Sequence, residues 1–504
     1  MMKKPGISPL SQVCHAVVAC RMVLFDHDDD KPREECGVFG IYGNHEASLL
    51  TALGLHALQH RGQEACGIIS FDGKRFPSER HMGMVGEHFG GNLSTRLPGH
   101  AAIGHNRYST QGRPMLRNIQ PIFADLAGGG FAVAHNGNLT NSRKLRHDLE
   151  RDGAIFQSTM DTEVILHLVA RSSRGHFLER LVDALSRIEG GYALVGLTGK
   201  KLIGARDPVG LRPLVLGRLG EAWVLASETC ALDIIGAKFE REVENGEIVV
   251  ISEKGIESHR FAQQRPPSPC VFEYVYFARP DSIVQGRSIY EVRRRMGHQL
   301  ALETPCEADV VVPVPDSGVP AALGFSEHSG IPFQMGIIRN HYVGRTFIQP
   351  TQTGRQTAIS KKHSPNKAVL DGKRVVLVDD SIVRGNTSKK IVQMVKDAGA
   401  KEVHFRSASP PIVHPDFYGI DMAAESELFA AIHTHEEMMR ELKVNSLGFL
   451  SVPGLYKAIG EPQRNAMAPQ FADHCFTGAY PTPLVDKEHD ESDKEHQLSL
   501  LDDA

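Results

Sequence analysis

Residues 375–388 of this 504-residue chain read VVLVDDSIVRGNTS, and this stretch decides the fold of the C-terminal half. Its β-branched, apolar start predicts a buried strand that ends at two adjacent carboxylates, Asp379 and Asp380. A loop with one glycine and several hydroxyl groups follows, and a helical pattern begins near Lys389. This order of strand, acid pair, polar loop and helix indicates an α/β unit with an anion-binding loop.

The acid pair and the loop suit the two ends of a sugar diphosphate. Backbone N–H groups and hydroxyls at a helix start bind a phosphate monoester. Two carboxylates at a strand end suit ribose hydroxyls and a Mg²⁺ ion. The alternative is a strand end with two solvated aspartates before a turn. The joint presence of acid pair, glycine and hydroxyl cluster favours the phosphate site.

A second strand end carries similar groups. Residues 308–314 predict a strand, and the sequence Pro-Asp-Ser-Gly follows it at residues 315–318. A hydroxyl, an acid and a glycine at a strand end suit pyrophosphate, although the same four residues are also common in turns. Ligands of open α/β sheets bind at the carboxyl ends of strands, so we expect this loop and residues 379–388 to form one site.

Strands and helices alternate through the C-terminal half. This alternation predicts a mainly parallel sheet with helices on both faces. The further expected strands are residues 332–338, 374–378 and 402–407, and the expected helices are residues 289–303, 318–329 and 388–399.

Length and composition bound the remaining possibilities. A chain this long needs two or more domains, and the proline-rich residues 263–269 mark a boundary. A net charge of −4 gives no reason to expect nucleic-acid or membrane partners. Eight scattered cysteines fit a reducing, cytoplasmic location, and no apolar run is long enough for a membrane span.

The expected organisation is a leader over residues 1–35, domains over residues 36–262 and 270–483, and a disordered charged tail over residues 484–504.

The N-terminal half shows many short β runs with a few helical stretches, which predicts a layered α+β domain. Five polar islands interrupt these runs, at residues 34–37, 58–64, 104–110, 135–139 and 158–163. Each island has an ordinary explanation by itself. A cysteine beside glycine is usually core packing, and Asn-Gly is usually a hairpin turn.

Together the islands supply what amide hydrolysis needs. Cys36 is the candidate nucleophile, and its own α-amino group becomes a base with a pKa near neutrality once the preceding peptide bond is cut. Arg107 suits an α-carboxylate, and Asp161 suits an α-ammonium group. Asn136 and the N–H of Gly137 suit a developing oxyanion.

Specific motifs then connect the two halves. They read CGVFG at residues 36–40, QHRGQE at 59–64, FARPDS at 277–282 and YVGRTFIQP at 342–350. With these motifs and the acid-pair loop, the chain resembles the amidophosphoribosyltransferases. The resemblance implies an N-terminal-nucleophile glutaminase domain with αββα layers, followed by an α/β phosphoribosyltransferase domain. It also implies transfer of glutamine-derived ammonia to C1 of phosphoribosyl pyrophosphate, the first step of purine synthesis.

The resemblance also implies roles for particular residues. It places Mg²⁺ and diphosphate at Ser317, Asp379 and Asp380. Arg345 belongs to a cationic segment, residues 341–373, which we expect to form a lid over the pyrophosphate. Purine nucleotide effectors and a homo-oligomer are implied as well. The 5′-phosphate would be held by Ser381, Arg384, Gly385, Asn386, Thr387 and Ser388.

Two departures from the family pattern concern a cofactor and the leader. Some relatives hold an iron–sulfur cluster with four cysteines, of which Cys270 matches the first. We expect Asp416, Pro469 and Ala472 to replace the other three, and therefore no cluster. The leader of 35 residues is long. Either it is removed after residue 35, or translation begins later, for instance at Met22; both cases need a cut before Cys36.

Two other functions remain in competition. One is an N-terminal-nucleophile amidotransferase with a different acceptor, such as a sugar phosphate isomerase-type partner domain, which would have no need of the acid-pair loop. The other is a nucleotide-sensing regulator that keeps only the fold of a phosphoribosyltransferase. The acid-pair loop argues against the first function, and the acid pair together with all the glutaminase polar groups argues against the second.

Overall fold

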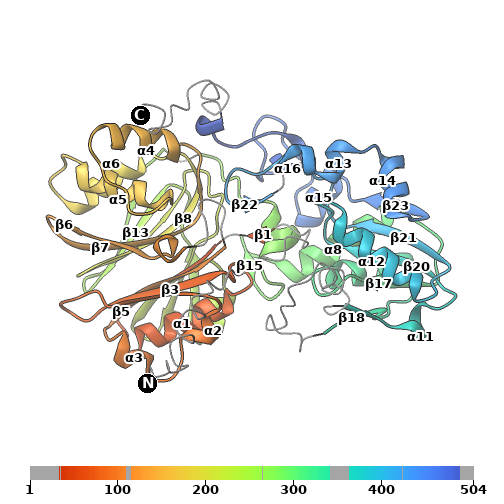
Figure 1. Ribbon diagram of the computed structural model, residues 1–504, viewed down its shortest axis with the longest axis horizontal. Coiled ribbons are helices and arrows are strands. Elements are labelled where there is room, and N and C mark those ends of the chain that lie inside the picture. The colour runs from red at the N-terminus through yellow and green to blue at the C-terminus, as the bar shows by residue number, and fades with distance from the viewer. Residues whose placement is uncertain are drawn as a thin grey trace, which may run out of the picture.

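The computed structural model describes residues 33–34, 36–108, 115–263, 265–340, 363–422 and 424–487. The two halves of the chain form two lobes that lie side by side (Figure 1). Residues 341–362 of the predicted lid, including Arg345, lie outside the described residues, as do most of the leader and the end of the tail. The rest of that segment, residues 363–373, is described and contains β19 (His363–Pro365) and α11 (Lys367–Leu370).

Two antiparallel sheets form the centre of the N-terminal lobe. The first sheet contains, in spatial order, β12 (Lys238–Glu242), β10 (Val215–Leu219), β11 (Ala222–Ala226), β2 (Cys36–Tyr42), β5 (Ala101–Arg107), β3 (Ala65–Phe71) and β4 (Ser78–Met82). The second contains β14 (Gly255–Arg260), β13 (Glu247–Ser252), β9 (Leu202–Arg206), β8 (Gly190–Thr198), β7 (Gly129–Leu139) and β6 (Ile122–Leu126).

Helices cover the outer faces of both sheets (Figure 1). Successive side chains of a strand point to opposite faces of its sheet, so neighbouring residues of β2 belong to different cores. Val38 packs between the sheets with Ala134 and Val195, whereas Phe39 packs outward against Leu55 of a helix. This arrangement confirms the predicted αββα layers. The longer helices are α1 (Ala47–Ala57) on the first sheet, and α4 (Ser142–Arg151), α5 (Thr162–Arg171) and α6 (Phe177–Leu185) on the second.

A four-stranded parallel sheet forms the centre of the C-terminal lobe. Its spatial order is β17 (Val310–Pro313), β20 (Arg374–Asp379), β21 (Glu402–Ser407) and β23 (Ser446–Phe449). Val376 and Val378 of β20 join one core, and Val375 and Leu377 join another, so both faces are covered as predicted. The first core includes residues of α8 (Ile289–Glu303), α9 (Val319–Ser329) and α15 (Val452–Ile459), and the second includes residues of α12 (Asn386–Asp397) and α14 (His435–Leu442).

Shorter elements complete the described chain. Those that matter below are the π-helix η2 (Glu273–Phe277), β1 (Arg33–Glu34) and β22 (Ile420–Asp421). Strand β1 ends two residues before the candidate nucleophile and pairs in antiparallel register with β22 of the other lobe. None of the helices in the described ranges has the length and apolar character needed to cross a membrane.

Two sequence predictions about the C-terminal half are wrong in detail. The strand expected at residues 332–338 is β18 (Ile337–Arg339), which pairs with β19 (His363–Pro365) in a separate two-stranded sheet. Pro332 cannot donate a ladder hydrogen bond, and only a single bridge at Phe333 reaches β17.

The predicted disordered tail begins too early. Leu484 packs against a small apolar cluster of Val209, Leu211 and Tyr418. The Asp486 carboxylate accepts hydrogen bonds from the backbone N–H groups of residues 143 and 144, at 2.8 and 3.1 Å. Residues 484–487 are therefore packed on the N-terminal lobe, because one half-buried leucine and one helix-capping acid outweigh the high charge of the segment.

Candidate functional site

The thiol of Cys36 and the guanidinium of Arg107 belong to paired strands. Cys36 begins β2 and lies directly opposite Arg107, the last residue of β5. Residues opposite each other in an antiparallel pair present their side chains on the same face. Both residues are buried, with 6% and 3% of their surfaces exposed. The sheet register thus brings together a candidate nucleophile and a candidate carboxylate clamp.

Asn136 and Gly137 lie on β7 of the second sheet. Asn136 is completely buried, and neither polar atom of its side-chain amide has a hydrogen-bond partner among the described residues. Because an unsatisfied buried amide is costly, this pattern favours a group reserved for a ligand. Gly137 has a φ of +123°, and a Cβ there would lie 2.0 Å from the carbonyl oxygen of Gly191. Only glycine fits this position.

Asp161 lies at the start of α5 and close to the end of β7. Its Oδ1 accepts a hydrogen bond from Thr162 N at 2.8 Å, and its Oδ2 accepts one from Leu139 N at 3.0 Å. Burial acts to raise the pKa of Asp161, but His135 at 3.3 Å and the two N–H groups outweigh burial, so the pKa is lowered. The carboxylate is therefore ionised and can receive an ammonium group.

The acid pair closes β20 as the sequence predicted. Asp379 and Asp380 are almost completely buried. The Asp380 N–H donates to Asp379 Oδ1 at 2.9 Å, and the Ser381 hydroxyl donates to Asp380 Oδ1 at 2.6 Å. These contacts fix the two carboxylates at the carboxyl end of the strand, where parallel sheets bind ligands.

The predicted phosphate loop leads directly into α12. Gly385 adopts a left-handed conformation with a φ of +80° and precedes the first helical residue, Asn386. Thr387 and Ser388 follow in the buried first turn. The helix therefore begins three residues before the expected Lys389, because left-handed Gly385 ends the loop earlier. Arg384 lies at the loop edge and forms a 3.3 Å ion pair with Glu427.

The second predicted anion loop lies beside the first. Val314 N donates a hydrogen bond to Val378 O at 2.8 Å, which aligns the ends of the two strands. A Cβ at Gly318 would lie 2.5 Å from the same carbonyl oxygen, so only glycine allows this approach. Ser317 is thereby placed at the shared edge of the sheet with Asp379 and Asp380. Hydroxyl and carboxylate oxygens are the ligands that Mg²⁺ prefers.

Comparisons with known proteins agree with this division. Residues 105–233 match the glutamine amidotransferase domain, and residues 281–407 match the phosphoribosyl transferase domain. The amidophosphoribosyltransferase of Rhizobium etli is 58% identical over 467 residues, which cover 91% of this chain and 94% of that relative. This chain belongs to the amidophosphoribosyltransferase family. It is therefore a glutamine-dependent phosphoribosyltransferase.

Two further similarities come from Bacillus subtilis. Its amidophosphoribosyltransferase is 48% identical over 454 residues, which cover 90% of this chain and 95% of that protein. A solved structure of glutamine phosphoribosylpyrophosphate amidotransferase from B. subtilis, complexed with ADP and GMP, matches with a TM-score of 0.84 and 46% identity. That match covers 89% of this chain and 98% of the solved chain.

The residues of this amidophosphoribosyltransferase do not fit a four-thiolate iron–sulfur cluster. Cys270 forms a β-bridge with Ala472, and Cys475 lies close to Asp416 and His474. Ala472 and Cys475 therefore lie where the sequence analysis expected Pro469 and Ala472, which corrects the assignment of this pair by three residues. Asp416 Oδ1 lies 2.7 Å from His474 Nε2, and its Oδ2 accepts two backbone hydrogen bonds. Two thiols, an alanine and an engaged carboxylate cannot supply four thiolates.

Two buried histidines of the glutamine site were not assigned a role from the sequence. His135 Nδ1 lies 2.8 Å from the Thr162 hydroxyl, and His105 Nε2 lies 3.1 Å from His135 O. Burial lowers the pKa of His105 well below its usual value, so this imidazole is neutral. Both histidines belong to the polar islands, but one contact joins the two sheets and the other joins β7 to α5, and no local spacing indicates them.

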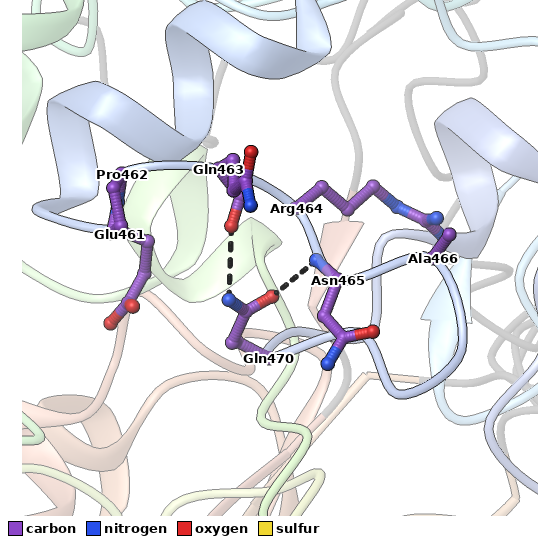
Figure 2. A pocket seen from close by; sticks show the side chains of 7 residues that line it. All are labelled: Glu461, Pro462, Gln463, Arg464, Asn465, Ala466 and Gln470. Carbon is purple, nitrogen blue, oxygen red and sulfur yellow. Dashed lines mark hydrogen bonds between the residues drawn. The ribbon is translucent and has the colours of Figure 1, made fainter.

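The protein also has a surface pocket of about 460 Å³ (Figure 2). It is formed by the loop of residues 461–470 and contains none of the predicted site residues. Hydrogen bonds of Gln470 to Gln463 O and from Asn465 N, both at 3.0 Å, hold the loop together. The folding of this loop on itself creates the pocket, and the residues that line it include no candidate nucleophile and no acid pair.

Glu163 supports the glutamine site through the turn before α5. Its carboxylate accepts hydrogen bonds from Gln157 N and Ser158 N, both at 2.7 Å, and from the Ser158 hydroxyl at 2.6 Å. Burial acts to raise the pKa of Glu163, but His167 and these donors outweigh burial and lower it to about 2. The ionised carboxylate therefore stabilises the turn.

We expect Glu163→Gln to lower the free energy of unfolding by about 1–3 kcal/mol at neutral pH. A lowered carboxyl pKa contributes stability that is fully present above the unfolded pKa, about 4.3, and is lost as pH falls toward 2. The difference from wild type should stay constant between pH 7 and pH 5 and shrink at pH 4, measured by thermal unfolding. Glu150→Gln, which alters an exposed pair with Arg146, is the control and should change little.

Proposed function

We propose that this amidophosphoribosyltransferase releases ammonia from glutamine at Cys36 and delivers it to C1 of 5-phosphoribosyl 1-pyrophosphate at the acid-pair loop. The products are 5-phosphoribosylamine, pyrophosphate and glutamate, the first step of purine synthesis. The observation that carries this assignment is the buried, unsatisfied amide of Asn136 in the lobe that also holds Cys36, Arg107 and Asp161. A purely structural site would not leave that amide without a partner.

The glutaminase steps follow from the positions of these groups. After the peptide bond before Cys36 is cut, the new α-amino group takes the thiol proton, and the sulfur attacks the glutamine carboxamide. Asn136 and the N–H of Gly137 stabilise the oxyanion. The proton returns to the leaving nitrogen, ammonia departs, and water hydrolyses the thioester to glutamate. Arg107 and Asp161 hold the α-carboxylate and the α-ammonium group.

The transferase steps use the loops at the sheet edge. The first turn of α12 and residues 381–388 bind the 5′-phosphate. Asp379 and Asp380 bind the ribose hydroxyls and, together with Ser317, would hold Mg²⁺. A bound Mg²⁺ would supply positive charge that stabilises the pyrophosphate leaving group. Ammonia attacks C1, the bond from C1 to the pyrophosphate oxygen breaks, and pyrophosphate leaves.

We infer that maturation removes every residue before Cys36, because the α-amino base exists only in a cut chain. Intact mass and N-terminal sequencing should show a mature chain that begins at Cys36. An active, glutamine-consuming enzyme that retains the leader would contradict this mechanism.

The remaining assignments concern cofactors and partners. We propose that the enzyme carries Mg²⁺ and no iron–sulfur cluster, that it is a homo-oligomer in the cytoplasm, and that purine nucleotides regulate it. The ADP and GMP in the B. subtilis structure support the last point. Stoichiometric iron and acid-labile sulfide in the purified protein would contradict the absence of a cluster.

The test of function is pyrophosphate release from phosphoribosyl pyrophosphate and Mg²⁺, with glutamine or ammonium chloride as the nitrogen donor. We expect release with both donors, and one glutamate per pyrophosphate with glutamine. No release with either donor would favour a nucleotide-sensing regulator. Glutaminase activity without pyrophosphate release would favour a different acceptor.

Asp161→Asn is expected to raise the KM for glutamine, because it removes the charge that faces the α-ammonium group. Loss of one partner of a buried charge pair costs about 2–4 kcal/mol, which corresponds to about 30- to 1000-fold in kcat/KM. Activity with ammonium chloride should not change, since glutamine is absent. Asp152→Asn, at an exposed pair with Arg171, serves as the control. An unchanged KM for glutamine would contradict the assignment of Asp161.

A further inference from the structure

Arg61 is a completely buried arginine at the junction of the two lobes. It comes from the QHRGQE motif, to which the mechanism above assigns no role. Its guanidinium forms an ion pair with Glu228 of its own lobe and with Glu273 of the C-terminal lobe. The Nη2–Oε2 distance to Glu273 is 2.6 Å, and the Nη1–Oε1 distance is 3.4 Å. A buried charge is costly to desolvate, so this position needs an explanation beyond packing.

The partner Glu228 is also held from both lobes. Its Oε2 accepts hydrogen bonds from Ser282 Oγ at 2.6 Å and from Arg279 N at 2.9 Å, and its Oε1 lies 2.6 Å from His60 Nε2. Burial acts to raise the pKa of Glu228, but Arg61 and His60 outweigh burial and lower it well below the usual value. The carboxylate is therefore ionised. Arg61 and its partners form a polar centre that fixes the contact between the lobes.

The backbone next to Arg61 lies against the glutamine clamp. A Cβ at Gly62 would lie 2.8 Å from the backbone N and C atoms of Arg107, so the turn after Arg61 touches the end of β5. Glu64 N also donates a hydrogen bond to Arg107 O at 3.1 Å. A displacement of Arg61 must therefore displace Arg107, because close-packed backbone has no slack.

On the other side, Glu273 begins the π-helix η2, which is tied to the transferase site. Arg293 of α8 is buried and donates hydrogen bonds to Tyr274 O and Ala278 O, both at 2.8 Å. Tyr274 and Phe277 of η2 also belong to the same buried core as Val378 and Val383, which flank the acid pair on β20 and on the phosphate loop. Arg293 thus fixes a turn that shares its core with the strand and the loop that carry the acid pair. Single π-helical turns are frequent at functional sites.

We propose that Arg61 is a positioning residue that sets the Arg107 clamp according to the state of the transferase lobe, through Glu273 and the η2 turn. The proposal rests on the proposed role of Arg107 in binding glutamine. A continuous chain of contacts does not by itself demonstrate energetic coupling between the two sites. The test must therefore measure an effect of one lobe on the other.

The test uses Arg61→Lys and Glu273→Gln in the full-length enzyme. Lysine cannot reproduce the fork geometry of the guanidinium, and glutamine keeps the shape of Glu273 without its charge. We expect the KM for glutamine to rise at least tenfold, and more than one glutamate to form per pyrophosphate released. Activity with ammonium chloride should stay within twofold of wild type. The double variant should be no worse than the worse single variant, because both break one interaction.

Asp473→Asn is the matched control. Asp473 is a completely buried carboxylate with a two-point contact to Arg464, at 2.6 and 3.1 Å, and both residues belong to the C-terminal lobe. Its loss should lower the Tm without changing the KM for glutamine or the ratio of glutamate to pyrophosphate.

Two results would overturn the proposal. One is a folded Glu273→Gln enzyme with wild-type KM and ratio. The other is an equal loss of the glutamine- and ammonia-dependent activities in step with Tm, which would assign Arg61 a purely structural role. A wrong assignment of Arg107 as the glutamine clamp can be distinguished from these two results, because Arg107→Ala would then leave the KM for glutamine unchanged.

Discussion

Cys36→Ser is expected to remove glutamine-dependent pyrophosphate release, by at least about 1000-fold, while activity with ammonium chloride remains. A thiol near a neutral-pKa amine gives a thiolate at pH 7, whereas a serine hydroxyl in the same place stays protonated. The transferase lobe contains no part of this chemistry, so ammonia supplied from solution should bypass the defect. Parallel assays of glutamate and pyrophosphate measure both activities.

The matched control is Cys66→Ser, in strand β3 of the same sheet. Burial, with a contribution from Glu87, raises the pKa of the Cys66 thiol to about 12, so this cysteine cannot act as a nucleophile at neutral pH. Cys66→Ser should keep the ratio of the two activities. If Cys36→Ser loses both activities equally, the thiol supports the fold and the proposed division of labour fails. Intact mass must accompany the assay, because the serine variant can also retain its leader.

The parts of the site that the sequence predicted are local. The acid pair and the loop to α12 lie within fourteen consecutive residues, and hydrophobic pattern plus one glycine suffice to place them. The parallel sheet was also predictable, because strands and helices alternate along the C-terminal half. The residue pattern of the N-terminal half indicated only a layered α+β domain, and the family resemblance implied its αββα layers. The prediction of a strand at residues 332–338 was wrong, because a hydrophobic pattern does not take account of Pro332, which cannot donate a hydrogen bond to a neighbouring strand.

The contacts between distant segments could not be predicted. Arg61 meets its partners 167 and 212 residues away, and the pairing of Cys36 with Arg107 depends on strand register. A sequence does not show whether a charged residue forms an ion pair with a residue this far along the chain or is exposed to solvent. The order of the five polar islands along the chain suggested one site. Only the folded structure shows that the buried side-chain amide of Asn136 has no hydrogen-bond partner among the described residues.

Asp380→Asn is the second change with a large expected effect, and it should remove activity with both nitrogen donors. The substitution takes one negative charge from the buried carboxylates proposed to hold Mg²⁺ and the ribose. We expect pyrophosphate release to fall by about 100- to 1000-fold, equivalent to about 3–4 kcal/mol of barrier. The measurement is pyrophosphate release at saturating Mg²⁺ with glutamine and with ammonium chloride in turn.

The control for this change is Asp397→Asn at the exposed end of α12, where the carboxylate accepts a 2.8 Å hydrogen bond from Gln393. It should leave both activities within twofold of wild type. Because Asp380 receives the Ser381 hydroxyl, an asparagine there keeps an acceptor oxygen, so a Tm close to wild type is expected. Retained ammonia-dependent activity in a folded Asp380→Asn enzyme would move the metal and ribose site away from this strand end. The cluster of hydroxyls in the first turn of α12 would then bind only the phosphate.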